Sequence, residues 1–245
     1  MTGADAPMPT PPGRRPRRGA PPRRRLTADL IVTTALGVLD AEGLDAVSMR
    51  RVAQELDTGP ASLYAHVSGK DELVELMLDR VAGEVELPER PDPARWQEQL
   101  KEIAHAGRRV WTAHRDIARA HLGLIPTGAG LLRIADAQLG AMRAGGVPPR
   151  IAALAVDALG MLVSSSAIEE TAYQARVGEG DVQEHFAQRI GEVREYFGKL
   201  PPDRFPNIIA MADELTSGTG EERFAFGLDV LVRGIASHAI PPGTD

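Results

Sequence analysis

The chain has 245 residues, of which 43% are hydrophobic and only 4% aromatic, and its formal net charge is −6. This composition favours helices over sheets, and the length allows a substantial core in one large or two smaller domains. The absence of cysteine excludes disulfides, thiolate catalysis and cysteine-based zinc sites. No continuous apolar run reaches the ~18 residues of a membrane span. The first residues lack a secretory hydrophobic core, so we expect a soluble, cytoplasmic protein with no membrane partner.

Residues 1–25 differ from the rest of the chain. They contain seven arginines, seven prolines and three glycines against one acid, Asp5, which gives this segment a net charge of +6. Because it has almost no apolar residue, we expect it to be disordered. It is either a solvated tail or a basic arm that follows phosphates or enters a minor groove. Residues 26–86, with four basic and twelve acidic residues, carry −8, so attraction to phosphate would depend largely on the arm and a few cations.

The next segment predicts three short helices. A first helix runs from Thr27 to about Glu42 and ends at Gly43. Residues 48–70 then predict two helices joined by a tight corner, because Met49, Val52, Ala53 and Leu56 recur at helical spacing before a break at 57–60.

The break supplies both a stop and a start. Thr58 is expected to cap the second of the two helices in 48–70, and Pro60 is tolerated in the first turn of that helix. That helix should reach about Val67. Ser68 is then expected to cap the following helix, with Asp71 bonding back to it. A helix this short, held on two neighbours, suits the insertion of its N-terminal end into a DNA major groove.

Residues 27–70 resemble the N-terminal helix-turn-helix domain of TetR-family transcriptional repressors. The resemblance rests on AxxVLDAEGLDAVSMRRVAQEL and SLYAHVSGKDEL, and above all on Leu-Tyr-x-His-Val followed by Lys-x-x-Leu. It implies a three-helix DNA-binding head that docks on double-stranded operator DNA.

The remainder of the chain also reads as helices and connectors. A helix of about 69–86 ends at a proline cluster in 87–93, which is a plausible domain boundary. We therefore expect an arm at 1–25, a DNA-binding domain with its linking helix at 26–86, and a ligand-binding and dimerisation domain at 87–245. Further helices are predicted at about 94–114, 116–122, 127–145, 148–175, 184–198 and 220–239.

Two C-terminal stretches, HRDIARAHLGLIPT (114–127) and ERFAFGLDVLVRGI (222–235), resemble the tetracycline repressor ligand-binding domain. In that subfamily, the helices equivalent to 148–175 and 220–239 form a four-helix dimer interface. Apolar stripes at three- and four-residue spacing agree with an extra partner beyond the internal core. The expected interface residues are Leu154, Ala158, Leu162, Phe224, Leu228, Leu231 and Ile235.

Several side chains of the predicted corner suit DNA contact. The guanidinium of Arg50 can bind guanine O6 and N7 together, and the resemblance places it where the tetracycline repressor reads a guanine. Serine, tyrosine and lysine side chains suit phosphates, and small apolar ones suit thymine methyls. Where that repressor has Gln and Trp, this chain has Pro60 and Ala65, so its operator should differ. The predicted contact set is Ser48, Arg50, Thr58, Pro60, Ala61, Ser62, Tyr64, Ala65, His66 and Lys70.

The resemblance also supplies a candidate ligand site. His121 aligns with the histidine that holds tetracycline-bound magnesium, and Glu169 with its outer-shell carboxylate. Leu124, Ile103 and Glu86 replace polar drug-binding residues, so a magnesium–tetracycline ligand is not expected. No cofactor is predicted, and magnesium would enter only with a tetracycline-like ligand. Because the expected lining is mostly apolar, a hydrophobic effector is favoured. The predicted ligand-binding residues are Glu86, Ile103, His121, Leu124, Met142, Met161 and Glu169, with Val85, Val110 and Leu139 as further lining.

Other motifs do not predict catalysis or metal binding. His105, His114 and His121 lack the short spacing of zinc ligand pairs. Ser164–Ser166 lack a nucleophile elbow, and the glycines at 127–130 lack the strand and Lys-Ser/Thr of a phosphate loop.

The sequence therefore predicts an all-α, homodimeric, ligand-responsive repressor that binds a palindromic operator and is released by a small molecule. The alternatives are an activator or architectural DNA-binding protein of the same fold, and a helical small-molecule-binding protein.

Overall fold

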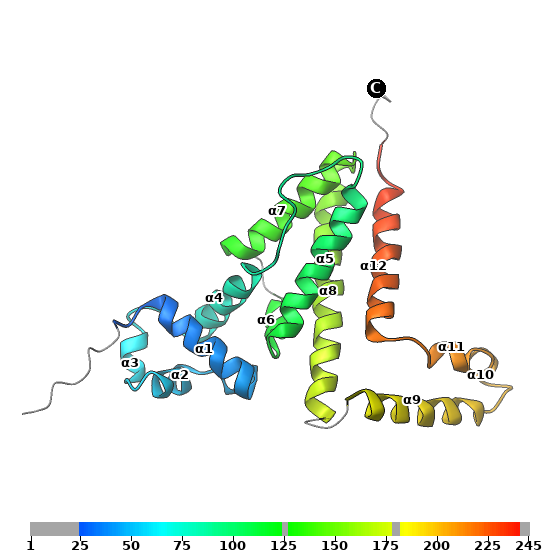
Figure 1. Ribbon diagram of the computed structural model, residues 1–245, viewed down its shortest axis with the longest axis horizontal. Helices are drawn as coiled ribbons and strands as arrows, with labels where there is room; N and C mark the ends of the chain where they lie inside the picture. The colour runs from blue at the N-terminus through cyan, green and yellow to red at the C-terminus, as the bar shows by residue number, and fades with distance from the viewer. Residues whose placement is uncertain (1–24, 124–126, 178–181, 241–245) are drawn as a thin grey trace, which may run out of the picture.

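The computed structural model describes residues 25–123, 127–177 and 182–240. Across these three ranges it contains helices and no strand, which confirms the predicted all-α class (Figure 1). The arm at 1–24 and position Leu124 lie outside the described residues.

The N-terminal head is made of short helices. It contains α1 (Ala28–Glu42), the 3₁₀ turn η1 (Leu44–Ala46), α2 (Met49–Glu55), α3 (Pro60–Leu63) and α4 (Lys70–Ala82). Thr27 caps α1 by accepting a hydrogen bond from the Leu30 N–H at 3.1 Å. At its other end Gly43 has a φ of +89°, a conformation that favours glycine. A shared core buries Ile31, Leu39, Val52, Leu63, Val67, Leu73 and Met77.

The C-terminal part is a helical bundle from which a few of the helices project. It contains α5 (Trp96–Ala113), α6 (Ile117–His121), α7 (Ala129–Ala144), α8 (Pro149–Val177), α9 (Val182–Gly198), α10 (Pro206–Ala210), α11 (Ala212–Leu215) and α12 (Gly220–Ala236). α5 packs against α7 and α8, and α12 lies along α8 and α5. Figure 1 shows α4 joining the head to this bundle, with α9 to α11 extending away on the far side.

Two predicted helix ends move. The helix α3 ends at Leu63 rather than about Val67, because the residues that follow it form a turn. The linking helix ends at Ala82 rather than about residue 86, because the Gly83 N–H closes the last turn on carbonyls of the preceding residues and an irregular connector follows. The segment before α12 contains α10 and α11, which the sequence did not predict. Their few apolar residues are too short a run to produce a periodic pattern.

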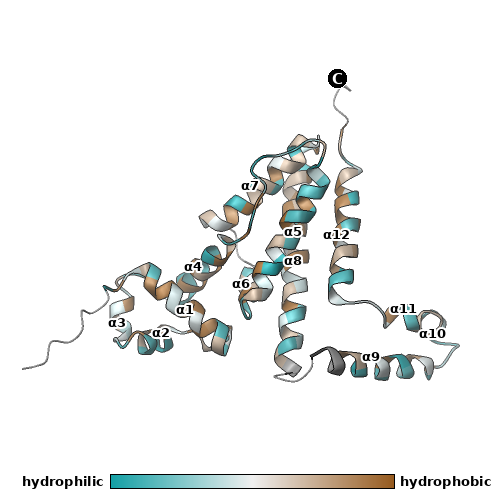
Figure 2. Ribbon diagram, in the orientation of Figure 1, coloured by the Kyte–Doolittle hydropathy of each residue, from teal (hydrophilic) through white to brown (hydrophobic). Residues whose placement is uncertain are grey.

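The helix α8 is the longest element of the described residues and contains a long apolar stretch. The stretch Pro149–Ala175 is long and apolar enough to cross a membrane by length and composition, although central helices of soluble proteins pass the same test. Figure 2 shows apolar and polar residues interspersed along α8 and α12, as expected of helices with one side packed inward.

Candidate DNA-binding surface and ligand cavity

The corner between α2 and α3 is built from backbone bonds and one left-handed residue. Ser48 caps α2 by accepting from the Arg51 N–H at 3.1 Å. The Thr58 N–H donates to the Ala53 carbonyl at 2.9 Å. Asp57 has a φ of +50°, which aspartate tolerates better than most residues. These constraints fix the direction in which α3 leaves the corner.

Most of the predicted DNA-contacting residues form one exposed surface. Leu63 and Val67 point into the core, so the residues between and before them face outward. The Tyr64 side chain, at 55% exposure, is the largest apolar group on this surface. Ser48 and Thr58 are half-buried, and the other residues of the set are exposed: Arg50, Pro60, Ala61, Ser62, Tyr64, Ala65, His66 and Lys70.

Two neighbouring arginines on α2 have different surroundings. The Arg51 guanidinium binds Glu42 at 2.6 Å and Glu55 at 2.7 Å. Hydrogen bonds from Arg51 lower the pKa of the Glu42 carboxyl. Arg50 is exposed, and within the described residues it has no ion-pair partner. Arg50 is therefore available to DNA, whereas Arg51 is engaged within the head.

The predicted N-caps of α3 and α4 are wrong. Gly59, and not Thr58, is the N-cap of α3, and Gly69 precedes α4 without a side-chain cap. The Glu72 carboxylate instead accepts from the Ser68 N–H at 2.5 Å. Hydrogen bonds from Ser68 lower the pKa of Glu72. The carboxylate one position beyond Asp71 thus satisfies the N–H before α4.

A cavity of about 520 Å³ lies between α5, α6, α7 and α8. This volume is typical of a small-molecule site. Its walls are mostly apolar or small, and its polar side chains are His121, Gln138 and Asp157. The full lining is Ile103, Ala104, Gly107, Trp111, His121, Leu122, Gly123, Leu131, Ile134, Ala135, Gln138, Ala153, Val156, Asp157, Gly160, Met161 and Val163.

His121 is held inside this cavity at the end of α6. Its Nδ1 lies 2.8 Å from Ser164 Oγ, and its ring centroid lies 6.1 Å from that of Trp111, with the planes tilted by 31°. Burial lowers the pKa of His121, and the negative charge of Asp157 opposes this in part. The imidazole is therefore neutral near pH 7.

The structure brings only some of the predicted ligand-binding residues together. Ile103, His121 and Met161 line the cavity. Met142 is fully buried in the core and does not line it, and Glu86 and Glu169 are exposed and do not line it either.

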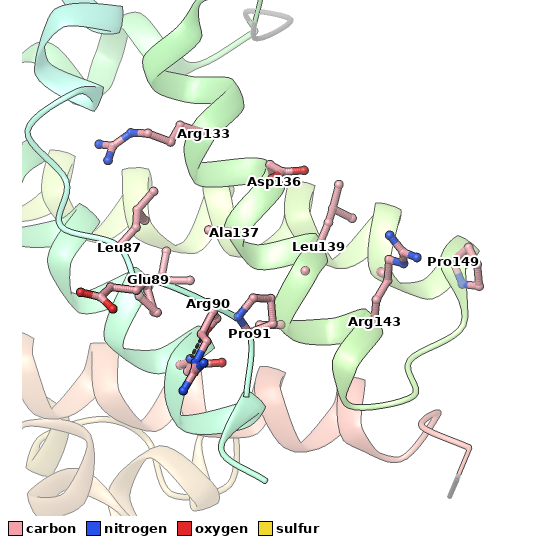
Figure 3. Close-up of a pocket in the computed structure, with 16 residues that line it drawn as sticks. Leu87, Glu89, Arg90, Pro91, Arg133, Asp136, Ala137, Leu139, Arg143 and Pro149 are labelled. Atoms are coloured by element: carbon pink, nitrogen blue, oxygen red, sulfur yellow. Dashed lines mark hydrogen bonds between the residues drawn. The ribbon is translucent and has the colours of Figure 1, made fainter. Parts of the chain in front are cut away.

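A second, more open pocket of about 610 Å³ lies beneath the connector at 87–91. It is formed by this connector with α5, α7 and the start of α8 (Figure 3). Ile103 contributes to both pockets, and Leu139 lines only this one. In Figure 3, Arg133 and Arg143 lie at opposite ends of the pocket.

The linking helix is bound directly to the start of α7. One Asp79 oxygen accepts from the Gly130 N–H at 2.7 Å and the Leu131 N–H at 3.2 Å. A carboxylate at this place satisfies free amide groups and interacts favourably with the helix dipole. The approach requires glycine, because a Cβ at Gly128 would lie 2.2 Å from Asp79 Oδ1, and one at Gly130 would lie 2.3 Å from the Asp79 carbonyl oxygen.

Arg133 strengthens the same contact from the next turn of α7. Its guanidinium donates to the Gly83 carbonyl at 2.9 Å and the Val85 carbonyl at 2.8 Å. The contacts of Asp79 and Arg133 thus join the DNA-binding head to α7, a helix that lines the cavity.

The turn between α5 and α6 makes a further contact with the head. His114 Nδ1 lies 3.2 Å from Asp40 of α1, and its Nε2 lies 3.3 Å from Glu84. Asp116 accepts from the Leu44 N–H at 3.4 Å and has a φ of +59°. The helix α6 follows this turn and ends at His121 inside the cavity. It therefore connects the cavity wall to the C-terminal end of α1.

The predicted dimer residues divide into two groups. Phe224, Leu228 and Ile235 are buried within the subunit, so they belong to its own core, because they face α8 and α5 and not outward. Leu154 is 59% exposed, and Ala158, Leu162 and Leu231 are half-buried. The sequence missed the most exposed apolar residues of α12, which are Phe226 at 72% and Val230 at 54%.

The three histidines singled out by the sequence lie in separate places. His105 contacts Glu221, His114 contacts Asp40 and Glu84, and His121 contacts Ser164. In the described part of the chain, no group of three or more potential metal ligands occurs.

Sequence reasoning missed Trp111, Gln138 and Asp157 in the cavity, and Asp79 with the glycines of α7 at the junction. The pattern Thr127-Gly-Ala-Gly130 was a usable signal. Two glycines at a helix start indicate a close approach of another backbone as well as a phosphate loop.

Comparisons with known proteins support both halves of this description. Residues 31–77 match the family described as bacterial regulatory proteins, tetR family, and residues 87–239 match the tetracyclin repressor-like C-terminal domain. The HTH-type transcriptional repressor DrrR1 of Streptomyces coeruleorubidus is 32% identical over 91% of this chain and 81% of that protein.

Solved structures give the same result. The structure of ActR from Streptomyces coelicolor in complex with actinorhodin is 42% identical, with a TM-score of 0.78, over 89% of this chain and 98% of that one. Among the sequence relatives, the tetracycline repressor protein class D of Escherichia coli is 26% identical over 86% of this chain and 89% of its own length.

Proposed function

Because the chain belongs to the TetR family of transcriptional regulators, we propose that it acts as a cytoplasmic homodimer on a twofold-symmetric operator. The observation that carries this proposal is the exposed surface of α2 and α3, where Arg50 is free while Arg51 is ion-paired. Each head would place α3 in a major groove, with the two half-sites about one helical turn apart.

The residue roles follow from their chemistry. Arg50 would read a guanine by a bidentate bond. Ser62, Tyr64 and Lys70 would bind phosphates and fix the register of the head. Pro60, Ala61 and Ala65 would contact thymine methyls, and His66 would reach the backbone or a base edge.

The second subunit would pack on the exposed apolar side of α8 and α12. Leu154, Phe226 and Val230 are the largest apolar side chains there. Burial of such groups contributes about 1.5–3 kcal/mol per residue, and a twofold axis would double each contact.

The effector would bind in the cavity around His121. ActR, which is 42% identical to this chain, has been solved in complex with actinorhodin, and this supports a small-molecule effector. Occupancy would shift α6 and α7. The contacts of Asp79 and Arg133 would transmit this shift to α4 and its connector, and the His114 contact with Asp40 would transmit it to α1. A changed separation of the heads lowers operator affinity, since both heads must dock together.

Selection from a pool of random duplexes tests this function. The purified protein is expected to enrich an inverted repeat whose half-sites lie about 10–10.5 base pairs apart, or a multiple of that spacing. Lys70→Ala should weaken binding to all enriched sequences alike, because a phosphate contact carries no base information. Recovery of unrelated sequences, with affinity set by length alone, would contradict the proposal.

A further inference from the structure

One imidazole at the turn between α5 and α6 joins the bundle to two separate segments next to it. His114 directly follows the last residue of α5, and its side chain is only 17% exposed. Its Nδ1 lies 3.2 Å from a carboxylate oxygen of Asp40, in α1. Its Nε2 lies 3.3 Å from a carboxylate oxygen of Glu84, in the connector that follows α4. The ring therefore bridges α1 and the segment through which the head continues into the bundle.

This bridge depends on the protonation state of the imidazole. A neutral imidazole has one N–H group, so it can donate to only one of two carboxylates, and its other nitrogen presents a lone pair to the second. An imidazolium has an N–H group on each nitrogen and a positive charge, so it can donate to both. An arrangement with a carboxylate at each ring nitrogen of His114 is therefore complete only when the ring is protonated.

The residues that follow His114 hold the same turn against the head without using the imidazole. Arg115 donates to the Ala41 carbonyl at 3.3 Å, and Asp116 accepts from the Leu44 N–H at 3.4 Å. These two bonds keep the turn at the end of α1 whatever the charge of the ring. The bridge of His114 thus adds to a contact that already exists.

The other charged groups of the packed helices are engaged with one another. Arg119 of α6 lies 3.5 Å from Asp45, and Arg80 of α4 pairs with Asp29 at the start of α1. Carboxylate and guanidinium groups keep their charge between about pH 5.5 and 8.5, whereas imidazoles change theirs in this range. A change of pH across this range therefore acts on the bridge of His114 and leaves the neighbouring contacts in place.

We propose, resting on the transmission route described above, that His114 is a proton-dependent clamp between the DNA-binding head and the bundle, which makes operator binding sensitive to pH. With the ring protonated, α1 and the connector after α4 are both fastened to the turn between α5 and α6. With the ring neutral, one carboxylate loses its donor and the head gains freedom. A clamped head has fewer arrangements to lose when both heads dock together, so the proton favours operator binding.

A double-mutant cycle at two pH values tests the clamp without DNA. His114→Gln removes the titrating ring and Asp40→Asn removes one charged partner, so the cycle isolates the interaction between them. Urea unfolding at one fixed protein concentration gives the coupling as a factor in the equilibrium constant of unfolding. We expect this factor to be about threefold or more larger at pH 5.5 than at pH 8.5. A second cycle, with Glu84→Gln in place of Asp40→Asn, should give the same pH dependence.

Operator affinity tests the regulatory part of the inference. Between pH 8.5 and 5.5, the affinity of the original chain should rise about threefold more than that of His114→Gln. The matched control is His105→Gln, because His105 is also in α5 and lies 3.3 Å from Glu221 of α12, within the bundle. This control removes an equal charge and leaves the clamp intact, so its affinity should rise as in the original chain. His66 of the DNA-binding surface is present in all three proteins, so its effect cancels.

Three results would overturn the inference. They are a coupling that does not weaken from pH 5.5 to 8.5, an equal rise of operator affinity in the original chain and His114→Gln, and loss of the extra rise in His105→Gln as well. Circular dichroism at both pH values checks that each variant is folded. Because the cycle needs no DNA, a chain that bound no operator at either pH would contradict the proposed function, and the cycle would still decide the clamp.

Discussion

At the scale of single residues, the two arginines of α2 illustrate how position decides role. Arg51 is held between Glu42 and Glu55, whereas Arg50 faces outward. Both have the same charge and adjacent places in the chain. Their neighbours therefore determine which one serves the fold and which one is available to DNA.

We expect Arg50→Ala to cost about 1–3 kcal/mol of binding at one base pair and to relax the preference there. Competition between the operator and duplexes with single base-pair changes measures this effect. Arg51→Ala is the matched control. It should lower the free energy of unfolding only slightly, since exposed ion pairs contribute little, and keep the base preference. Equal loss of preference in both variants would contradict the assignment of Arg50.

His121 makes folding stability depend on pH in a definite direction. Its pKa is lowered in the folded state, so below its ordinary value of about 6.5 the unfolded chain binds the proton more readily. Its contribution is therefore fully present above about pH 6.5 and is lost as the pH falls towards the folded pKa. The loss cannot exceed about 1.4 kcal/mol per pH unit, because one proton is involved.

Urea unfolding at pH 7.5 and 5.5 tests this prediction. His121→Gln, which keeps a polar side chain near Ser164, should lose less stability between these two pH values than the original chain does. A pH dependence that is identical in the two proteins would show that His121 does not titrate differently on folding.

At the scale of elements, the junction of α4 and α7 depends on the absence of side chains at the start of α7. Gly128→Ala would place a Cβ 2.2 Å from Asp79 Oδ1, so either the carboxylate must turn away from the N–H groups of Gly130 and Leu131 or the two helices must separate. We expect a loss of about 1–3 kcal/mol in the free energy of unfolding and a weaker response of operator affinity to a bound effector. Thermal or urea unfolding measures the first effect, and operator titration with the effector measures the second.

The control for this prediction is Gly191→Ala in α9, where a Cβ meets nothing within 4 Å. That change should stabilise the protein by up to about 1 kcal/mol through helix propensity. If Gly128→Ala behaved in the same way, the close contact at Asp79 would not constrain the two helices.

The helices that the sequence predicted are those with local signals. Thr27 and Gly43 bound α1, and the break at 57–60 separates α2 from α3. Contacts between distant segments left no such signal. Asp79 looks like any acid on the polar side of a helix, and the stripe of Phe224, Leu228 and Ile235 could face its own core or a partner equally well. Periodicity defines which residues share a face, and only packing shows what covers it.

At the scale of the whole molecule, charge is distributed unevenly along the chain. Residues 1–25 carry +6 and residues 26–86 carry −8. The protein is a ligand-responsive DNA-binding repressor of the TetR family, so its acidic head must approach a polyanion. The sequence predicts that the arginine-rich segment supplies most of the attraction.

Deletion of residues 1–25 should therefore weaken binding to every duplex and flatten the dependence of affinity on salt. Each lost phosphate contact lowers the slope of log affinity against log salt by about 0.9. The preference for the operator over unrelated DNA should survive, because the α2–α3 surface remains. Loss of that preference together with the arm would indicate an architectural DNA-binding protein.

The central claim is that two copies of the chain present their α3 helices to DNA as a twofold pair, and the distance between the heads tests it most directly. Because the chain contains no cysteine, a single Gln54→Cys substitution places one spin label on the exposed side of each α2. Pulsed dipolar spectroscopy on the operator complex should give one narrow distance, compatible with recognition helices about 34–36 Å apart. The coupling should vanish in a Phe226→Asp variant that cannot pair. If the labelled chain without the Phe226→Asp change gave no dipolar coupling in its operator complex, the account would be contradicted.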